Sequence, residues 1–243
     1  MIKFFRRIRQ NLIMENKTSK YFKYAIGEIL LVVIGILIAL QINNWNENRK
    51  LKLNEKYIIE NLIEDLQSDY NNYETNKRGL EDQLKLVDQL IEVPANKIID
   101  KTSYLHQLRW GGNIVSIAFE ENISKEIVNK DIQEAIKIYY RNQKTTITEA
   151  TVYWEVVRDL VRPFLRKHGI HNSKSVKELN YYADDIDIEL LIEEKLTAHY
   201  GSEEFEQILF ELRLKGGGLI NLLDKLSKSN RELTNVLKAY TND

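Results

Sequence analysis

The chain has 243 residues, of which 43% are hydrophobic and 29% charged, with two prolines, ten glycines and no cysteine. This length allows one or two domains, and so few helix-breaking residues predict an all-α protein. The lack of cysteine excludes disulfides, thiolate metal sites and a cysteine nucleophile, while a formal net charge of −1 hides a strong asymmetry along the chain.

Residues 1–23 are strongly basic and are predicted to lie in the cytoplasm. Residues 1–24 carry a net charge of +6, so the rest of the chain sums to −7. Within "MIKFFRRIRQNLI", apolar residues recur at helical spacing and the arginines fall on other faces. This pattern predicts an amphipathic segment that lies on the anionic lipids of the inner leaflet. The basic residues of this flank include Arg6, Arg7, Arg9, Lys20 and Lys23.

Residues 24–44 are predicted to form a transmembrane helix. Every residue of Ile29–Leu40 is apolar or glycine, and no charge occurs between Glu28 and Glu47. The stretch Tyr24–Ile42 would be about 28 Å long at about 1.5 Å per residue, close to the hydrocarbon thickness of about 30 Å. A helix in a soluble core normally keeps a polar stripe, and no small-x-small cleavage site follows for a signal peptide. We therefore expect a retained anchor.

The flanks of this span predict its orientation. Trp45 lies just after the apolar stretch, at the position where aromatic residues anchor a transmembrane helix at the membrane–water interface. Seven Lys and Arg residues precede the span, whereas residues 43–64 have four, balanced by four glutamates. The positive-inside rule places the N-terminus in the cytoplasm and residues 45–243 on the other side of the membrane.

Glu28 has two interpretations. Within a turn of the cytoplasmic interface, it could pair with Lys20 or Lys23, which is the interpretation we favour. Alternatively it is an intramembrane carboxylate in a helix oligomer or an ion-conducting subunit. Gly35 and Ala39 form a small-xxx-small pair, so the same helix could self-associate as a homo-oligomer.

The N-terminal residues also carry a family likeness. "MIKFFRRIRQ" and then "KYFKYAIGEILLVVIGILIALQINNWNE", which ends at Glu47, resemble the opening of a large family of short Bacteroidota membrane proteins of unknown function. The likeness is tight over residues 1–47 and loose beyond. It implies a bacterial inner-membrane protein with a helical periplasmic domain, and it supplies no catalytic residues.

After the span, the chain from Trp45 to Ile91 has no proline and a single glycine. This composition predicts that the transmembrane helix continues, or breaks only briefly near residues 43–45. The apolar positions follow a repeat of 3.5 residues, typical of a helical packing seam. The predicted seam consists of Leu62, Leu66, Tyr73, Leu80, Leu84, Val87 and Ile91.

Between the long helices, shorter elements are expected. The pattern predicts helical pieces at about 100–109 and 113–128, and two more at about 174–180 and 187–199. "NIVSIAF" at 113–119 is the best strand candidate, although it fits a buried helical turn equally well.

A very regular helix is predicted over residues 131–164. Its apolar residues are spaced by threes and fours, and Asp131 is the candidate N-cap. Pro163 is expected to kink its end, and Gly169 to terminate it.

The last predicted helix covers residues 205–240. Gly216–Gly218 would each cost about 1 kcal/mol relative to alanine in a helix. Either the helix breaks there, or Gly216 lets a neighbouring helix approach closely; we favour a continuous helix. Together these elements predict an antiparallel bundle of about four helices on a membrane stalk.

No cofactor or metal site is predicted. His168 and His171 lie three residues apart around Gly169, a spacing that suits a solvated turn better than a metal site. His106 and His199 are isolated in the sequence. In "DDIDIE", residues 184–189, the carboxylates lack the glycine and closing glutamate of a calcium loop, so weak cation binding is the lesser interpretation.

These observations favour an accessory interaction protein of the envelope over an enzyme. "KGGGL" lacks the spacing of a phosphate-binding loop, and an acidic body does not favour nucleic acid. The predicted partners are therefore membrane lipid, envelope proteins and a second copy of the chain. The enzymatic alternative would assemble a site from His106, Arg109, Glu120 and Glu121.

Overall fold

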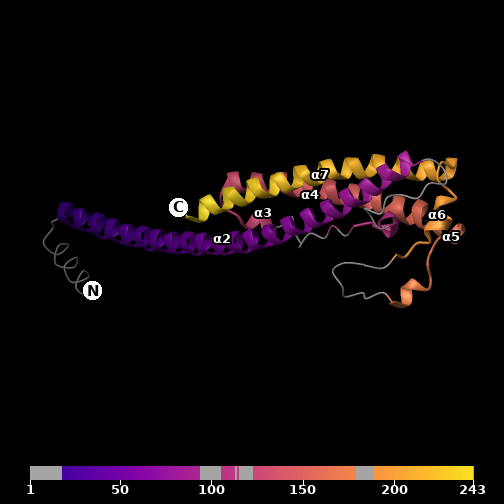
Figure 1. Ribbon diagram of the computed structural model, residues 1–243. Helices are drawn as coiled ribbons and strands as arrows, with labels where there is room; N and C mark the ends of the chain where they lie inside the picture. The colour runs from indigo at the N-terminus through magenta and orange to yellow at the C-terminus, as the bar shows by residue number, and fades with distance from the viewer. Residues whose placement is uncertain (1–17, 94–104, 113, 115–122, 179–188, 243) are drawn as a thin grey trace. The chain divides into compact units, whose positions relative to one another are not determined.

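The computed structural model confirms the predicted all-α class (Figure 1). The structure describes residues 18–93, 105–112, 114, 123–178 and 189–242. The chain divides into two compact units, Met1–Glu55 and Lys56–Asp243, whose border falls inside a helix.

Helix α2, Thr18–Glu92, continues without interruption through residues 43–45. The continuous helix is therefore the correct one of the two alternatives. No proline occurs before Pro94, so the backbone ladder is not broken. The helix ends two residues ahead of Pro94, because the residue that precedes a proline is disfavoured in the helical conformation.

The predicted seam of α2 is buried from Leu62 to Val87, but Ile91 is 53% exposed. The buried position in the last turn belongs to Leu90 instead, which is 2% exposed. An α-helix has 3.6 residues per turn, so its buried face drifts away from a strict 3.5-residue repeat over several turns. The prediction was wrong at Ile91 for this reason.

Helix α4 covers Lys130–Val156. With Asp131 as its N-cap it would begin at residue 132, so the predicted cap was wrong by two residues. The N-cap is Asn129, whose backbone is extended and whose Oδ1 accepts hydrogen bonds from the amides of Asp131 and Ile132 at 2.9 and 3.2 Å. Asp131 lies in the first turn, where its charge suits the helix dipole.

The distortion that Pro163 was expected to cause lies ahead of it. A π-helical turn, η2 (Val157–Val161), joins α4 to α5 (Arg162–Lys167), and the amide of Arg162 donates to the carbonyl of Val157. Pro163 cannot donate to the carbonyl four residues before it and its ring crowds that carbonyl. The ladder therefore widens by one residue just before the proline.

Gly169 terminates α5, as predicted. Its φ is +62°, the left-handed conformation that glycine adopts without steric cost. The amide of Ile170 donates to the carbonyl of Leu165 at 2.9 Å, which closes a Schellman turn.

Each predicted short helix includes a described helical element, and the rest of each prediction falls partly outside the described residues. These elements are η1 (Leu105–Arg109), α3 (Ile123–Glu126), η3 (Ser175–Glu178) and α6 (Glu193–Thr197). The strand candidate at 113–119 lies outside the described residues except for Ile114, and "DDIDIE" lies outside them except for Glu189.

Helix α7, Glu203–Asn242, runs unbroken through Gly216–Gly218, which confirms the favoured alternative. A Cβ built on Gly216 would lie 2.8 Å from Leu84 Cδ2 and 3.1 Å from Tyr153 Cε2. A larger residue there would therefore push α2 and α4 away from α7.

The three long helices are not all antiparallel, which corrects the predicted topology. Tyr73 of α2 contacts Tyr139 of α4, and Gln83 farther along α2 contacts Tyr153 farther along α4. Because the residue numbers of the contacting pairs increase in the same direction along both helices, α4 runs parallel to α2 within the unit Lys56–Asp243.

Helix α7 runs antiparallel to both neighbours. Asn230 donates to the carbonyl of Leu66, whereas Arg213, earlier in α7, pairs with Asp88, later in α2. Figure 1 draws α7 alongside α4. The bundle core of the described residues is therefore made of the Lys56–Glu92 part of α2 together with α4 and α7.

The connection between α2 and α4 explains the parallel pair. After α2 the chain turns back along it, since the carbonyl of Leu108 accepts from Gln83 and the Trp110 ring lies against Gly79. A long return of this kind brings the chain back to the start of the bundle before α4 begins. A short turn would have made α4 antiparallel.

Candidate functional site

The first candidate site is the apolar start of α2. The large apolar side chains of Ile29–Leu40 are between 45% and 71% exposed, on every face of the helix. Within the described residues, α2 is the one helix long and apolar enough to cross a membrane, and none of that apolar window is buried. Such a surface suits lipid rather than water.

The residues singled out for self-association lie on this exposed surface. Gly35 and Ala39 are exposed, and a Cβ built on Gly35 would meet nothing within 4 Å among the described residues. Glu28 is half-buried, and Lys23, five residues earlier in the same helix, is exposed. The structure places Glu28, Gly35 and Ala39 on one continuous helix.

The polar end of the apolar stretch is built around Trp45. Its ring is 65% exposed, and the guanidinium carbon of Arg49 lies 6.0 Å from the ring centroid. Asn43 donates to Glu47 at 3.1 Å, one turn apart. An amphipathic ring beside charged groups is typical of a membrane interface. The backbone of Lys20 is helical, whereas Arg6, Arg7 and Arg9 lie outside the described residues.

The second candidate site is an apolar groove in the unit Lys56–Asp243. It has a volume of about 680 Å³ and lies between the last turn of α2 and the first half of α7. Ile91, Phe210 and Leu214 line it and are 53–55% exposed. Arg213 on its wall is paired with Asp88 at 2.6 Å, whereas Glu206 lines the groove and forms no ion pair with any described residue. The groove could hold apolar side chains of another chain.

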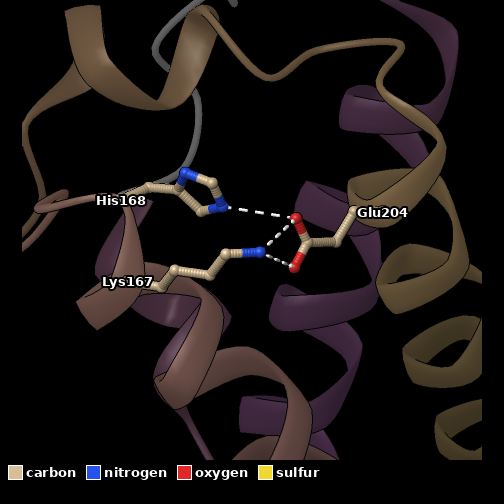
Figure 2. Close-up of polar contacts among 3 residues, drawn as sticks. All are labelled: Lys167, His168 and Glu204. Atoms are coloured by element: carbon tan, nitrogen blue, oxygen red, sulfur yellow. Dashed lines mark hydrogen bonds and ion pairs between the residues drawn. The ribbon is translucent and has the colours of Figure 1, made fainter.

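Two of the histidines meet at the junction of α5 and α7. Figure 2 shows Lys167 and His168 converging on Glu204, with Lys167 Nζ at 2.9 Å and His168 Nε2 at 3.3 Å from its oxygens. The rings of His168 and His199 lie 4.0 Å apart. Neither histidine is therefore a simple solvated residue. This pairing could not be predicted from local sequence patterns, because thirty residues of chain separate the two histidines.

Aromatic rings pack around the two histidines at this junction. Phe164 contacts both histidine rings and stacks on Phe205. Within the described residues, no group of three or more His, Cys, Asp or Glu side chains is arranged to hold a metal ion. Partial burial and the neighbouring His168 lower the pKa of His199.

The residues of the enzymatic alternative come together only in part. His106 Nδ1 lies 3.9 Å from Glu189 Oε1, and burial lowers the pKa of His106. Glu189 also accepts from the amide of Leu105 at 2.9 Å, so this carboxylate fastens η1 to the segment before α6. Arg109 lies at the end of η1, whereas Glu120 and Glu121 lie outside the described residues.

Comparison with known proteins identifies one similar family. The model of a "Family of unknown function (DUF6090)" matches residues 28–108, which is one third of the chain and leaves α4 and α7 outside. The match is consistent with the likeness to an uncharacterised family, while the bacterial group and the N-terminal signature stay predictions. No curated protein and no solved structure matches the chain. The chain is therefore similar, over the apolar start of α2, the rest of that helix and η1, to proteins whose role is not known.

Proposed function

We propose that this protein is a membrane-anchored accessory protein of the bacterial envelope without enzymatic activity. The start of α2 would cross the inner membrane, and residues 45–243 would form a periplasmic bundle that binds another envelope protein. The observation that carries the proposal is the apolar stretch Ile29–Leu40, exposed on all faces. In water this surface would associate non-specifically, whereas a bilayer removes it from water along its whole length.

The charge pattern supports the direction of insertion. The basic flank precedes the apolar stretch, and the positive-inside rule keeps such a flank in the cytoplasm. The residues after Trp45 would then lie in the periplasm.

Self-association through the span is part of the proposal. Gly35 and Ala39 lie one turn apart and are exposed, so a second helix could approach the backbone closely at this face. Glu28 is seven residues before Gly35 and therefore lies near the same face, at its cytoplasmic end.

The bundle would bind its partner at the groove of Ile91, Phe210 and Leu214. We assign to it an amphipathic helix of another envelope protein, because a groove of this kind accommodates apolar side chains spaced by one helical turn. Glu206 on the wall supplies a negative charge that no described residue pairs with, so the helix should carry a lysine or arginine beside its apolar residues.

Photo-crosslinking in the native membrane tests this function. A benzophenone amino acid at position 210 should yield one stoichiometric envelope partner, with the crosslink in an amphipathic helix that carries a basic residue. Position 236 is the matched control, because Val236 is also an exposed apolar residue of α7 but lies outside the groove. Identical products from both positions, or none from position 210, would contradict the proposal, and Phe210→Glu should abolish co-purification of the partner.

A further inference from the structure

Two histidine rings face one another beside the start of α7. The ring of His168, at the end of α5, lies 4.0 Å from the ring of His199, in the turn that follows α6. Phe164 contacts both rings, at 4.7 Å from His168 and 5.2 Å from His199 between centroids. Phe164 is 3% exposed and stacks on Phe205 of α7, which is 2% exposed. Buried aromatic rings therefore hold the two imidazoles against one another.

Charged side chains from α5, α6 and α7 face this pair. Glu204 at the start of α7 accepts from Lys167 Nζ at 2.9 Å, and His168 Nε2 lies 3.3 Å from its Oε2 (Figure 2). Lys195 of α6 donates to the carbonyl of Gly169, the residue after His168. The hydrogen bond from Lys167 lowers the pKa of Glu204, so this carboxylate stays ionised in mild acid. One carboxylate is thus shared between a lysine and a histidine.

The number of protons on the two rings decides whether they attract or repel. A pair that carries at most one positive charge packs without electrostatic cost, whereas two imidazolium ions at this separation repel one another. Partial burial and the neighbouring His168 lower the pKa of His199, so the second proton binds only in acid. The two rings should therefore titrate as a coupled pair.

The backbone of His199 is tied to the edge of the apolar groove between α2 and α7. Its carbonyl accepts from the amide of Ser202 at 3.0 Å, and the carbonyl of Ser202 accepts from the amide of Glu206 at 2.9 Å. Gly201, between them, lines the groove together with Glu206. A displacement of His199 would therefore be transmitted to this edge.

The opposite wall of the groove belongs to the last turn of α2 and does not carry the histidines. Leu90 in that wall is 2% exposed, so packing in the bundle core holds this part of α2 in place. A shift of the turn after α6 would therefore change the shape of the groove rather than move both walls together.

We propose that His168 and His199 form a pH switch that controls binding at this groove. When both rings carry a proton, their repulsion displaces the turn Ala198–Ser202, the groove edge at Gly201 and Glu206 changes its position relative to α2, and the bound helix is released. Protonation of clustered histidines changes interfaces in other pH-sensitive proteins in this way. The inference rests on the proposed function of the groove and adds the regulation of that site.

Histidine-selective NMR on the full-length protein in detergent tests the coupling of the two rings. With carbon-13-labelled histidine, the titration midpoint of His199 should lie below the ordinary histidine value of about 6.5. It should rise in His168→Gln, because the neighbouring positive charge is gone. The same midpoint for His199 in both proteins would overturn the switch.

Pulsed EPR measures the groove edge without any partner. The chain has no cysteine, so Glu92→Cys at the end of α2 and Glu203→Cys at the start of α7 place two spin labels at exposed positions beside the two walls. The distance between the labels should change by more than about 2 Å between pH 7.5 and pH 5.5. An unchanged distance would overturn the switch. Loss of the helical circular dichroism signal at pH 5.5 would also overturn it, since acid would then unfold the bundle instead of moving one edge.

Two variants assign the movement to this pair. His199→Phe retains a ring that packs on Phe164 but cannot be protonated, so it should fold and keep one label distance at both pH values. His171→Gln is the matched control, because burial lowers the pKa of His171 as well, but this residue forms a β-bridge with Leu191 away from the groove edge. It should respond to pH like the wild type. A full response in His199→Phe, or a response lost in His171→Gln, would contradict the assignment.

Photo-crosslinking at position 210 separates the switch from the function of the groove. The yield of the crosslinked partner should fall by about fivefold or more from pH 7.5 to pH 5.5, and it should stay constant in His199→Phe. A partner captured equally at both pH values would overturn the switch and leave the proposed function intact. If no partner is captured at either pH, the proposed function fails, and the label distance alone decides whether the histidines move the groove edge.

Discussion

Tyr73 of α2 and Tyr139 of α4 share a hydrogen bond of 3.1 Å between their hydroxyl groups inside the bundle. Asp69 Oδ2 accepts from Tyr73 at 3.2 Å and from Gln143 at 3.1 Å, and Asn230 of α7 donates to Tyr139 at 3.1 Å. Burial raises the pKa of Tyr73 to about 12, and it also raises that of Tyr139. One polar layer therefore joins all three long helices in a fixed register, as buried polar residues do in other helical assemblies.

Asp69→Leu should destabilise the bundle strongly. Asp69 is 1% exposed, and its removal leaves the donors of Tyr73 and Gln143 without their shared acceptor. We expect a loss of about 2–4 kcal/mol in the free energy of unfolding, measured by chemical denaturation. Asn71→Ala is the control on the exposed side of the same helix and should change it by less than about 0.5 kcal/mol. Similar losses in the two variants would contradict the polar layer's role.

Two glycines of α7 should respond in opposite directions. Gly216→Leu would overpack the contact with Leu84 and Tyr153 and should cost about 1–3 kcal/mol. A Cβ at Gly218 would meet no described residue within 4 Å, and alanine replaces a poor helix former, so Gly218→Ala should stabilise the protein by up to about 1 kcal/mol. Thermal melts of both variants check the sign. A stabilising Gly216→Leu would show that α7 does not pack as closely as described.

Bundle stability should fall as the pH drops below about 6.5. Burial lowers the pKa of His106, His171 and His199 below the ordinary value of 6.5. The unfolded chain therefore binds protons at these sites at a higher pH than the folded chain, and protonation favours unfolding. Melting temperatures measured between pH 7.5 and pH 5 should decline in the wild type. Replacing the three histidines with glutamine should make the melting temperature less dependent on pH. If the melting temperature of this variant declined with pH as steeply as that of the wild type, the three histidines would not be the cause.

Gly35→Leu should weaken self-association of the span. A leucine would project from the exposed face that carries Ala39 and keep a second backbone at a distance. Förster transfer between labelled copies in vesicles should fall relative to wild type. Leu37→Ile, at an exposed position of the same stretch, is the control and should leave the signal unchanged. An unchanged Förster signal in Gly35→Leu would show that the span does not self-associate through this face.

Periodicity within single helices could be predicted from the sequence, whereas contacts between them could not. The apolar seam explains why α7 continues through Gly216–Gly218, and the glycine at 169 marks the end of α5. The parallel course of α2 and α4 depends on the returning chain near Trp110, whose path no local pattern encodes.

The candidate sites show the same difference between what local sequence predicts and what depends on contacts between helices. The apolar start of α2 is visible in composition alone. The pairing of His168 with His199 depends on tertiary packing, because two histidines far apart in the chain give no local signal that they meet.

The central claim is that the start of α2 holds the bundle on the far side of the inner membrane. The most direct measurement is the activity of a dual alkaline phosphatase and β-galactosidase reporter fused after residue 243, together with extraction of the membrane fraction by carbonate. We predict phosphatase activity without galactosidase activity, and a protein that stays in the membrane until detergent is added. Galactosidase activity alone, or release of the protein without detergent, would contradict the account.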